Sequence, residues 1–295
     1  MSPEGLPAFL RAHGLTPRAR LGQHFLTDEG VLESIVAGAA IDPERDVVLE
    51  IGPGPGTLTR HIVQSGASVV AVEIDERFRA PVLERLGWPC NLHWINGDIL
   101  AGKHRLAPEP VRALRRLGAG DQHELVLVAN LPYQIAVPSL MNLLEADLGF
   151  RGGAVTVQKE LADRLVATPG SRDYGPASVF LRAAGSVRIV RRLKPGSFWP
   201  PPAVSSAVVT LELDPGWRGR LAPFESFRKL VTGLFRYRRK GLLAALRTYL
   251  GASLRETDVV QVAQCLGVGR RPETLDVDEF LELARALSGG ALRGC

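Results

Sequence analysis

The chain has 295 residues, of which 45% are hydrophobic, so it is long enough for one large domain or two unequal ones. Three widely spaced cysteines argue against a disulfide framework and against cysteine ligands for a metal. We therefore expect a protein without a metal that resides in a reducing compartment, the cytoplasm. The net charge of +5 permits a polyanionic partner, and no apolar run approaches the roughly 18 residues that a membrane span needs.

Buried strands and amphipathic helices alternate from residue 46 to residue 214. An apolar run at 46–51 predicts the first strand, and a helix over 57–65 follows it. Further strands are predicted at 68–75, 91–95, 124–129, 154–157, 187–190 and 207–211. This alternation is typical of a Rossmann-like α/β fold with a mostly parallel, seven-stranded sheet. A Pro-rich loop separates the last two strands, which we therefore expect to form an antiparallel pair at the sheet edge.

A helical part follows the α/β part. The stretch Asp214–Gly219 has the composition of a linker. Three helices are predicted beyond it, over 224–235, 257–267 and 276–287. We therefore expect an α/β domain over 1–214, with a lead segment over 1–27, and a small all-helical domain over 215–295.

Glycines and acidic side chains follow the first three predicted strands. Gly52, Gly54 and Gly56 let a ligand approach the backbone and lead into a helix N-terminus that favours an anionic group. Glu73 ends the second strand and can accept from both hydroxyls of a ribose, and Asp98 can accept from the amino group of an adenine. Because parallel strands end at one edge of a sheet, we expect these turns to form one ligand site.

The spacing of the glycines decides between two cofactors. A dinucleotide site requires G-x-G-x-x-G/A, whereas here the third glycine comes one residue early and Thr57 takes the slot of the last one. Glu50 beside the loop would repel a pyrophosphate but suits the ammonium group of an amino acid. The sequence therefore favours S-adenosylmethionine, which carries an amine, a carboxylate, a ribose and an adenine, and disfavours a nicotinamide oxidoreductase.

Asn130-Leu131-Pro132-Tyr133 directly follows the predicted strand that ends at Ala129. An amide, backbone carbonyls outside any helix and an aromatic ring suit a flat ligand that bears an amino group. The amide oxygen and a carbonyl can accept hydrogen bonds from the amine, and the ring of Tyr133 can stack on the base. The structural alternative is a proline turn with Tyr133 packed in the core.

The order and spacing of these motifs resemble the ribosomal RNA adenine N6-dimethyltransferases over nearly the whole chain. The motifs that carry the resemblance are Gly22-Gln23-His24-Phe25-Leu26, the loop from Glu50 to Gly56, Glu73-Ile74-Asp75, Gly97-Asp98, Asn130-Leu131-Pro132-Tyr133, Gln158-Lys159-Glu160, Tyr174-Gly175, Phe198-Trp199-Pro200-Pro201-Pro202 and Arg238-Arg239-Lys240. The resemblance implies a class I methyltransferase fold. It also implies dimethylation of two adjacent adenosines near the 3′ end of small-subunit (16S) rRNA, by a monomer that acts on a pre-30S particle in ribosome biogenesis.

The resemblance also assigns roles within the site. Cofactor contacts would fall on His24, Leu26, Gly52, Glu73, Asp98 and Asn130, with His24 standing where the family commonly has Asn. The Asn130 oxygen and the carbonyl of Leu131 or Pro132 would hold the target amine. Tyr133 would stack on one face of the adenine and Phe198 on the other. Methyl transfer from a sulfonium requires neither a metal nor a covalent intermediate, so catalysis would rest on positioning and electrostatics.

Basic residues gather in acid-free clusters on both sides of the Phe198 loop. Phosphate binding explains such clusters, and a solvated surface is the alternative. We predict RNA contacts at Arg191, Arg192, Lys194, Arg236, Arg238, Arg239 and Lys240.

Two further functions stay open on the sequence alone. Large-subunit rRNA adenine methyltransferases of the macrolide-resistance type more often have Ile where Leu131 stands, and they lack the Phe-x-Pro-Pro-Pro pattern. A ribosome-assembly factor that acts mainly by binding would not need an intact Asn130 and Tyr133, yet both are present.

Overall fold

The computed structural model describes residues 5–221, 224–251, 260, 263–264 and 266–287, which form two compact units. The first unit combines Met1–Ala162 with Arg188–Leu213, and the second combines Asp163–Val187 with Asp214–Cys295. The segment 163–187 therefore belongs to the second unit, whereas the sequence analysis assigned it to the first domain. The reason is local packing, because the helix within this segment buries its apolar face against helices from beyond residue 214.

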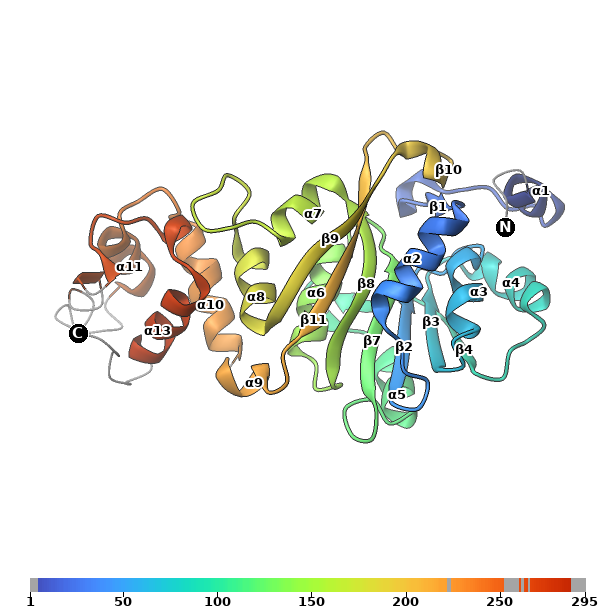
Figure 1. The fold of residues 1–295 in the computed structure, drawn as a ribbon, viewed down its shortest axis with the longest axis horizontal. Helices are drawn as coiled ribbons and strands as arrows, with labels where there is room; N and C mark the ends of the chain where they lie inside the picture. The colour runs from blue at the N-terminus through green and yellow to red at the C-terminus, as the bar shows by residue number, and fades with distance from the viewer. Residues whose placement is uncertain (1–4, 222–223, 252–259, 261–262, 265, 288–295) are drawn as a thin grey trace. The chain divides into compact units, whose positions relative to one another are not determined.

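One seven-stranded sheet forms the centre of the first unit (Figure 1), and only the first three residues of β9 fall outside that unit. The strands are β2 Asp46–Ile51, β3 Ser68–Glu73, β4 Leu92–Asn96, β7 Glu124–Asn130, β8 Phe150–Gln158, β9 Gly185–Leu193 and β11 Ser206–Leu213. Their order is β4-β3-β2-β7-β8-β11-β9. Neighbours from β4 to β8 pair in parallel, and β11 pairs antiparallel with β8. All seven predicted strands are present, and β9 and β11 are neighbours at the predicted edge.

Helices cover both faces of this sheet, so its central strands are buried along most of their length and are mainly apolar. The helices are α2 Glu29–Ala39, α3 Thr57–Val63, α4 Arg79–Leu86, α5 Pro108–Arg116 and α6 Ala136–Glu145. Figure 1 shows α2 and α3 in front of the sheet and α6 behind it. Asp28 begins α2 as its N-cap and accepts a hydrogen bond from the Val31 N–H. Leu32 and Ile35 of this helix pack into the core with Val126 of β7.

Short elements surround the carboxyl edge of the sheet. Before the sheet lie α1 Gly5–Ala12, the 3-10 helix η1 Ala19–Leu21 and the two-residue strand β1 Phe25–Leu26. β1 pairs antiparallel with β10 Phe198–Trp199, which follows η3 Pro195–Ser197. η2 Glu76–Phe78 follows β3, and β5 Leu100–Gly102 forms a hairpin with β6 Arg105–Leu106. These pieces are too short for periodicity to predict them.

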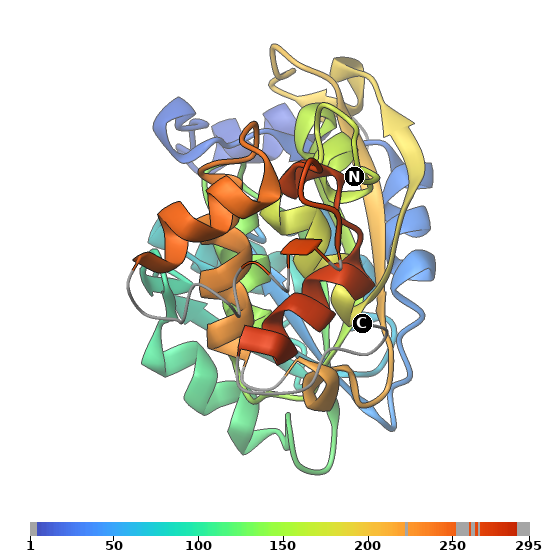
Figure 2. The ribbon, with the colours of Figure 1, turned by 90° about the vertical axis from the view of Figure 1, so that its left-hand side faces the viewer.

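The second unit is helical, as predicted. Its helices are α8 Pro176–Ala184, α9 Trp217–Arg220, α10 Phe224–Phe235, α11 Leu242–Leu250, η5 Pro272–Thr274 and α13 Val277–Leu287, and α7 Lys159–Leu165 runs into it (Figure 2). The ring of Phe180 in α8 packs edge-on against Phe224 and Phe227 of α10. Asp276 and Glu279 form the predicted capping box before α13. The helix predicted from residue 257 lies largely outside the described residues, and α11 was not predicted. In the described ranges, no helix is long and apolar enough to cross a membrane.

Candidate active site

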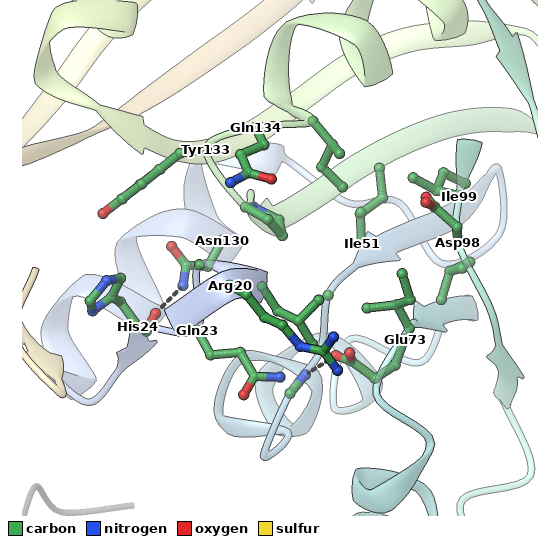
Figure 3. A pocket seen from close by; sticks show the side chains of 18 of the residues that line it. Arg20, Gln23, His24, Ile51, Glu73, Asp98, Ile99, Asn130, Tyr133 and Gln134 are labelled. Carbon is green, nitrogen blue, oxygen red and sulfur yellow. Dashed lines mark hydrogen bonds between the residues drawn. The ribbon is translucent and has the colours of Figure 1, made fainter. Parts of the chain in front are cut away.

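A cavity of about 610 Å³ lies at the carboxyl edge of the sheet, within the first unit (Figure 3). Its wall contains residues that end or follow β2, β3, β4 and β7, so the structure brings the four predicted turns together. The segment from Ala19 to Phe25 forms another part of the wall. The predicted site residues that line the cavity are His24, Gly52, Gly54, Glu73, Asp98, Asn130, Pro132 and Tyr133.

The glycine-rich loop brings bare backbone to the cavity wall. Gly52 and Gly54 have φ angles of +71° and +51°, in the left-handed region that favours glycine. A Cβ on Gly54 would lie 2.8 Å from the ring of Phe25, which leaves no room for a side chain. Gly56, with φ +72°, does not line the cavity. A Cβ there would lie 2.6 Å from Val82, so Gly56 permits the packing of α3 against α4 rather than ligand contact.

Glu73 is a buried carboxylate at the end of β3. Its Oε2 accepts from the Gly54 N–H at 2.8 Å, and its Oε1 accepts from the Asp75 N–H at 2.8 Å. Burial raises the pKa of Glu73 above its ordinary value, and these backbone hydrogen bonds oppose the rise. A carboxylate offers about four acceptor positions, so Glu73 can still accept from two hydroxyl groups of a ligand.

Asp98 lies on the same side of the cavity as Glu73, away from His24 and Tyr133 and near apolar Ile51 and Ile99 (Figure 3). Its Oδ1 accepts from the Leu100 N–H at 2.9 Å, which fixes the exposed carboxylate after β4. An acceptor next to aliphatic side chains suits a flat ring with an amino group. Among the described residues, no group of three or more His, Cys, Asp or Glu side chains is placed to hold a metal ion.

Asn130 ends β7, and the peptide group of His24 fixes its amide. The Nδ2 of Asn130 donates to the His24 carbonyl oxygen at 2.9 Å (Figure 3). A carbonyl can only accept, so the NH2 group must be the side of the amide that faces His24. The Oδ1 of Asn130 therefore remains as an acceptor for a donor in the cavity.

The backbone after Asn130 turns tightly. Leu131 is buried, and its N–H donates to the Thr156 carbonyl of β8 at 3.0 Å. The Pro132 carbonyl accepts from the Ile135 N–H at 3.1 Å and closes the turn before α6. Of these two predicted residues, Pro132 lines the cavity with its carbonyl partly used, whereas Leu131 is not in the lining.

Tyr133 presents a half-buried ring to the cavity. Its hydroxyl lies 3.3 Å from the Ser206 Oγ, and burial raises the pKa of the phenol above its ordinary value. The imidazole of His24 lies nearly parallel to the ring, with centroids 6.1 Å apart and planes at 22°. The Nδ1 of His24 bonds to the Pro200 carbonyl at 2.8 Å, so it carries the proton and leaves Nε2 as an acceptor when the ring is neutral.

Phe198 and Leu26 lie elsewhere than expected. They are partners in the β1–β10 pair, are 4% and 1% exposed, and pack in the core that contains Leu32 and Ile35. Neither side chain lines the cavity. The two-residue ladder fixes this placement, because it directs both side chains toward α2. The structure therefore does not bring the ring of Phe198 opposite Tyr133.

Several lining residues were not singled out from the sequence. The cavity also contacts Arg20, Gln23, Ile99, Gln134 and Gln158. Gln23 and Gln158 belong to motifs that carried the family resemblance, so the motifs located them without assigning a role. Arg20 lies two residues before the first of those motifs and has no sequence signal of its own.

Glu50 does not contact the cavity, although the sequence analysis placed its charge beside the cofactor loop. The side chain is 1% exposed, and its Oε2 has no hydrogen-bond partner among the described residues. Burial raises its pKa to about 8, with a smaller contribution from the nearby charge of Glu73. The structure therefore places Glu50 behind the cavity wall, with a raised pKa, rather than among the residues that line the cavity.

The predicted RNA-binding residues fall into both units. Arg191, Arg192 and Lys194 are exposed at the end of β9 in the first unit, and the Arg191 guanidinium donates to the Gly30 carbonyl at 2.7 Å. Those of the second unit follow α10. There, Arg236, Arg239 and Lys240 are exposed.

Arg238 differs from its neighbours because it is committed to an internal ion pair. Its Nε lies 2.5 Å from the Glu273 Oε2, and its guanidinium also donates to the Arg172 carbonyl at 3.1 Å. These bonds hold the loop before α8 to the end of α10. Arg238 therefore has a structural role within the second unit.

Comparison with known proteins identifies the family to which this fold and cavity belong. The family model described as "Ribosomal RNA adenine dimethylase" matches residues 14–284. A "Ribosomal RNA small subunit methyltransferase A" of Deinococcus radiodurans is 38% identical over 97% of this chain and 90% of its own length. The protein of the same name from Ligilactobacillus salivarius is 35% identical over 97% of this chain and 95% of its own length.

Solved structures agree with the sequence relatives. A dimethyladenosine transferase from Plasmodium falciparum superposes with a TM-score of 0.74 at 25% identity, over 92% of this chain and all of that one. The 23S rRNA methyltransferase ErmE has a TM-score of 0.61 at 23% identity and shares the fold. The sheet order and the cavity at its carboxyl edge define a class I methyltransferase. Within that class, the chain belongs to the ribosomal RNA adenine dimethylase family.

Proposed function

We propose that this protein transfers methyl groups from S-adenosylmethionine to the N6 atoms of two adjacent adenosines near the 3′ end of small-subunit rRNA. The observation that carries the proposal is the fixed amide of Asn130, whose NH2 group is held by the His24 carbonyl and whose oxygen remains available in the cavity. Family membership and relatives named as small-subunit methyltransferases support the choice of substrate.

The cavity offers donors and acceptors that suit the adenosine part of S-adenosylmethionine. Glu73 would accept from the ribose hydroxyls, and Asp98 with Ile99 would hold the adenine. The bare backbone at Gly52 and Gly54, which line the cavity, would leave room for the methionine part. When bound, the cofactor supplies an electrophilic methyl group on a sulfonium.

Catalysis would consist of orienting a weak nucleophile. The lone pair of an adenine N6 atom is delocalised into the ring, so the nitrogen must become more pyramidal before it can attack. The Asn130 Oδ1 and the carbonyl of Leu131 or Pro132 would accept its two N–H groups and aim the lone pair at the methyl group. The proton would leave after attack, because the alkylated nitrogen is strongly acidic, so no strong base is required.

The target base would enter from an unstacked position in the RNA. Tyr133 would stack on one face, with His24 next to it in the wall. A second round requires space for the first methyl group, since only one N–H then remains. Phosphate contacts would come from Arg191, Arg192 and Lys194 in the first unit and from Arg236, Arg239 and Lys240 in the second. The substrate would be a pre-30S particle in the cytoplasm.

The partition of methyl label between ribosomal subunits tests this function. The protein is incubated with labelled S-adenosylmethionine and separately with small and large subunits that lack N6 methylation, and the modified nucleotides are mapped by mass spectrometry. We expect N6,N6-dimethyladenosine at two adjacent positions near the 3′ end of the small-subunit rRNA. Label confined to large-subunit rRNA would instead support a macrolide-resistance type of activity. Tight binding to small subunits without transfer would support an assembly factor.

A further inference from the structure

The segment from Thr16 to His24, here called the N-terminal strap, lies along the cavity wall and connects two parts of the site. The strap is hydrogen-bonded to Asp75, two residues beyond Glu73 of the proposed ribose site. It is also hydrogen-bonded to Asn130, the residue proposed to hold the target amine. The sequence analysis assigned a cofactor contact to His24 but no role to Gln23, and a cofactor contact does not explain the hydrogen bonds of the strap.

Asp75 fastens the strap from one side. It is 2% exposed and accepts two hydrogen bonds from the Arg77 guanidinium, at 2.7 and 2.6 Å. The same guanidinium donates to the carbonyl of Thr16 at 3.2 Å, at the start of the strap. Although burial opposes the charged form, the hydrogen bonds from Arg77 and Gln23 lower the pKa of Asp75 to about 2, so the anchor is charged at neutral pH.

Gln23 is the strap side chain that reaches this anchor. It is 9% exposed, its Nε2 donates to the Asp75 Oδ2 at 3.1 Å, and its Oε1 accepts from the Arg18 N–H at 2.8 Å. Both ends of the amide are therefore in use. One bond fixes the strap to the turn after β3, and the other closes the strap on itself across five residues.

The next peptide group determines the orientation of Asn130. The carbonyl of His24 accepts from the Asn130 Nδ2 at 2.9 Å, while the His24 ring is held by the Pro200 carbonyl. A displacement of the strap would remove the only fixed acceptor that the structure gives the Asn130 NH2 group among the described residues. The amide could then turn by half a rotation and present a donor to the target amine, which is itself a donor.

We propose that Gln23 is a positioning residue for methyl transfer, because it holds the strap on Asp75 so that the His24 carbonyl keeps the Asn130 oxygen directed at the substrate. The inference rests on the role proposed for Asn130. It predicts that Gln23 acts on the rate of the chemical step through Asn130, and that it does so without contacting the reacting atoms.

A double-variant cycle tests this link. Single-turnover methylation of unmodified small subunits is measured at saturating cofactor for the wild type, Gln23→Met, Asn130→Ala and the double variant. The dissociation constant of S-adenosylhomocysteine is measured by calorimetry for each. Gln23→Met keeps the shape of the side chain and removes both hydrogen bonds. We expect it to slow transfer about ten- to a hundredfold, since a shift of about 1 Å in a catalytic group can cost that much. Cofactor affinity should change less than about threefold.

The decisive result is non-additivity. If Gln23 acts through Asn130, the double variant should be no slower than Asn130→Ala alone. Multiplied effects, or a Gln23→Met enzyme at the wild-type rate, would overturn the proposal while leaving the function intact. An Asn130→Ala enzyme at the wild-type rate would overturn the role of Asn130 and the inference together.

Two further variants separate positioning from folding. Gln64→Met changes an exposed glutamine at the end of α3, outside the cavity, and should leave transfer unchanged. Gln23→Asn is too short to reach Arg18 and Asp75 at once and should reproduce the non-additive loss. If both Gln23 variants lose cofactor binding and thermal stability, Gln23 is a structural residue and the proposal is wrong.

Discussion

Replacement of Glu50 by glutamine should remove a pH-dependent loss of stability. Glu50 is 1% exposed at the end of β2, and its Oε2 has no hydrogen-bond partner among the described residues. Burial raises its pKa from 4.5 to about 8. Between these two values the folded state keeps a proton that the unfolded state has lost, so the free energy of unfolding must fall as the pH rises.

The size of this loss follows from the two pKa values. One pKa unit corresponds to about 1.4 kcal/mol, so a shift from 4.5 to about 8 amounts to roughly 5 kcal/mol over the whole range. Between pH 5 and pH 8 the loss is about 3 kcal/mol, and above pH 8 it levels off. An amide of the same shape carries no proton to lose. Glu50→Gln should therefore match the wild type near pH 5 and exceed its stability by about 3 kcal/mol at pH 8.

Urea unfolding of both proteins at several pH values between 5 and 8 provides the assay. The difference between the two curves isolates Glu50, because other carboxyl groups, including buried Glu73, contribute to both. Glu44→Gln, at an exposed position before β2, serves as a control and should follow the wild type. Parallel curves for Glu50→Gln and the wild type would refute the assignment of Glu50 as a buried group with a raised pKa.

Three further changes test the cavity and the charged surfaces. Gly54→Ala should weaken the binding of S-adenosylhomocysteine at least about tenfold in calorimetry, because a Cβ at 2.8 Å from the ring of Phe25 and at φ +51° would displace the loop that lines the cavity; unchanged affinity would contradict a role of this loop in cofactor binding. Tyr133→Ala should weaken the binding of substrate particles to the enzyme by about 1–3 kcal/mol, because the stacking ring is lost. Tyr133→Phe should retain the stacking and weaken binding far less. Charge reversal of Arg239 and Lys240 should reduce the salt dependence of rRNA binding in filter assays and leave cofactor affinity alone; an equal loss of cofactor affinity would indicate misfolding.

The sheet and its carboxyl-edge turns were predictable because each depends on a local signal. Apolar runs located all seven strands, and the parallel order then brings Gly52, Glu73, Asp98 and Asn130 to one edge. The family resemblance added the identity of the ligand class, which periodicity cannot supply.

Residues whose placement depends on tertiary pairing were harder to place. Phe198 is buried because β10 pairs with β1, about 170 residues earlier in the chain, and no local pattern announces a two-residue ladder. Arg238 was grouped with RNA-binding residues by charge, yet a distant Glu273 takes its guanidinium. The sequence shows an acidic residue at position 50 but not its burial. Burial in the folded protein raises the pKa of Glu50, and this effect depends on the tertiary structure.

The most direct test of the central claim is the rate of methyl transfer by an Asn130→Ala variant that still binds cofactor. Unmodified small subunits are incubated with S-adenosylmethionine, and N6-methyladenosine and N6,N6-dimethyladenosine are quantified over time by mass spectrometry. Loss of one positioned acceptor should slow the first transfer at least about tenfold when the enzyme is saturated with S-adenosylmethionine. Transfer at the wild-type rate by a folded, cofactor-binding Asn130→Ala enzyme would contradict the account.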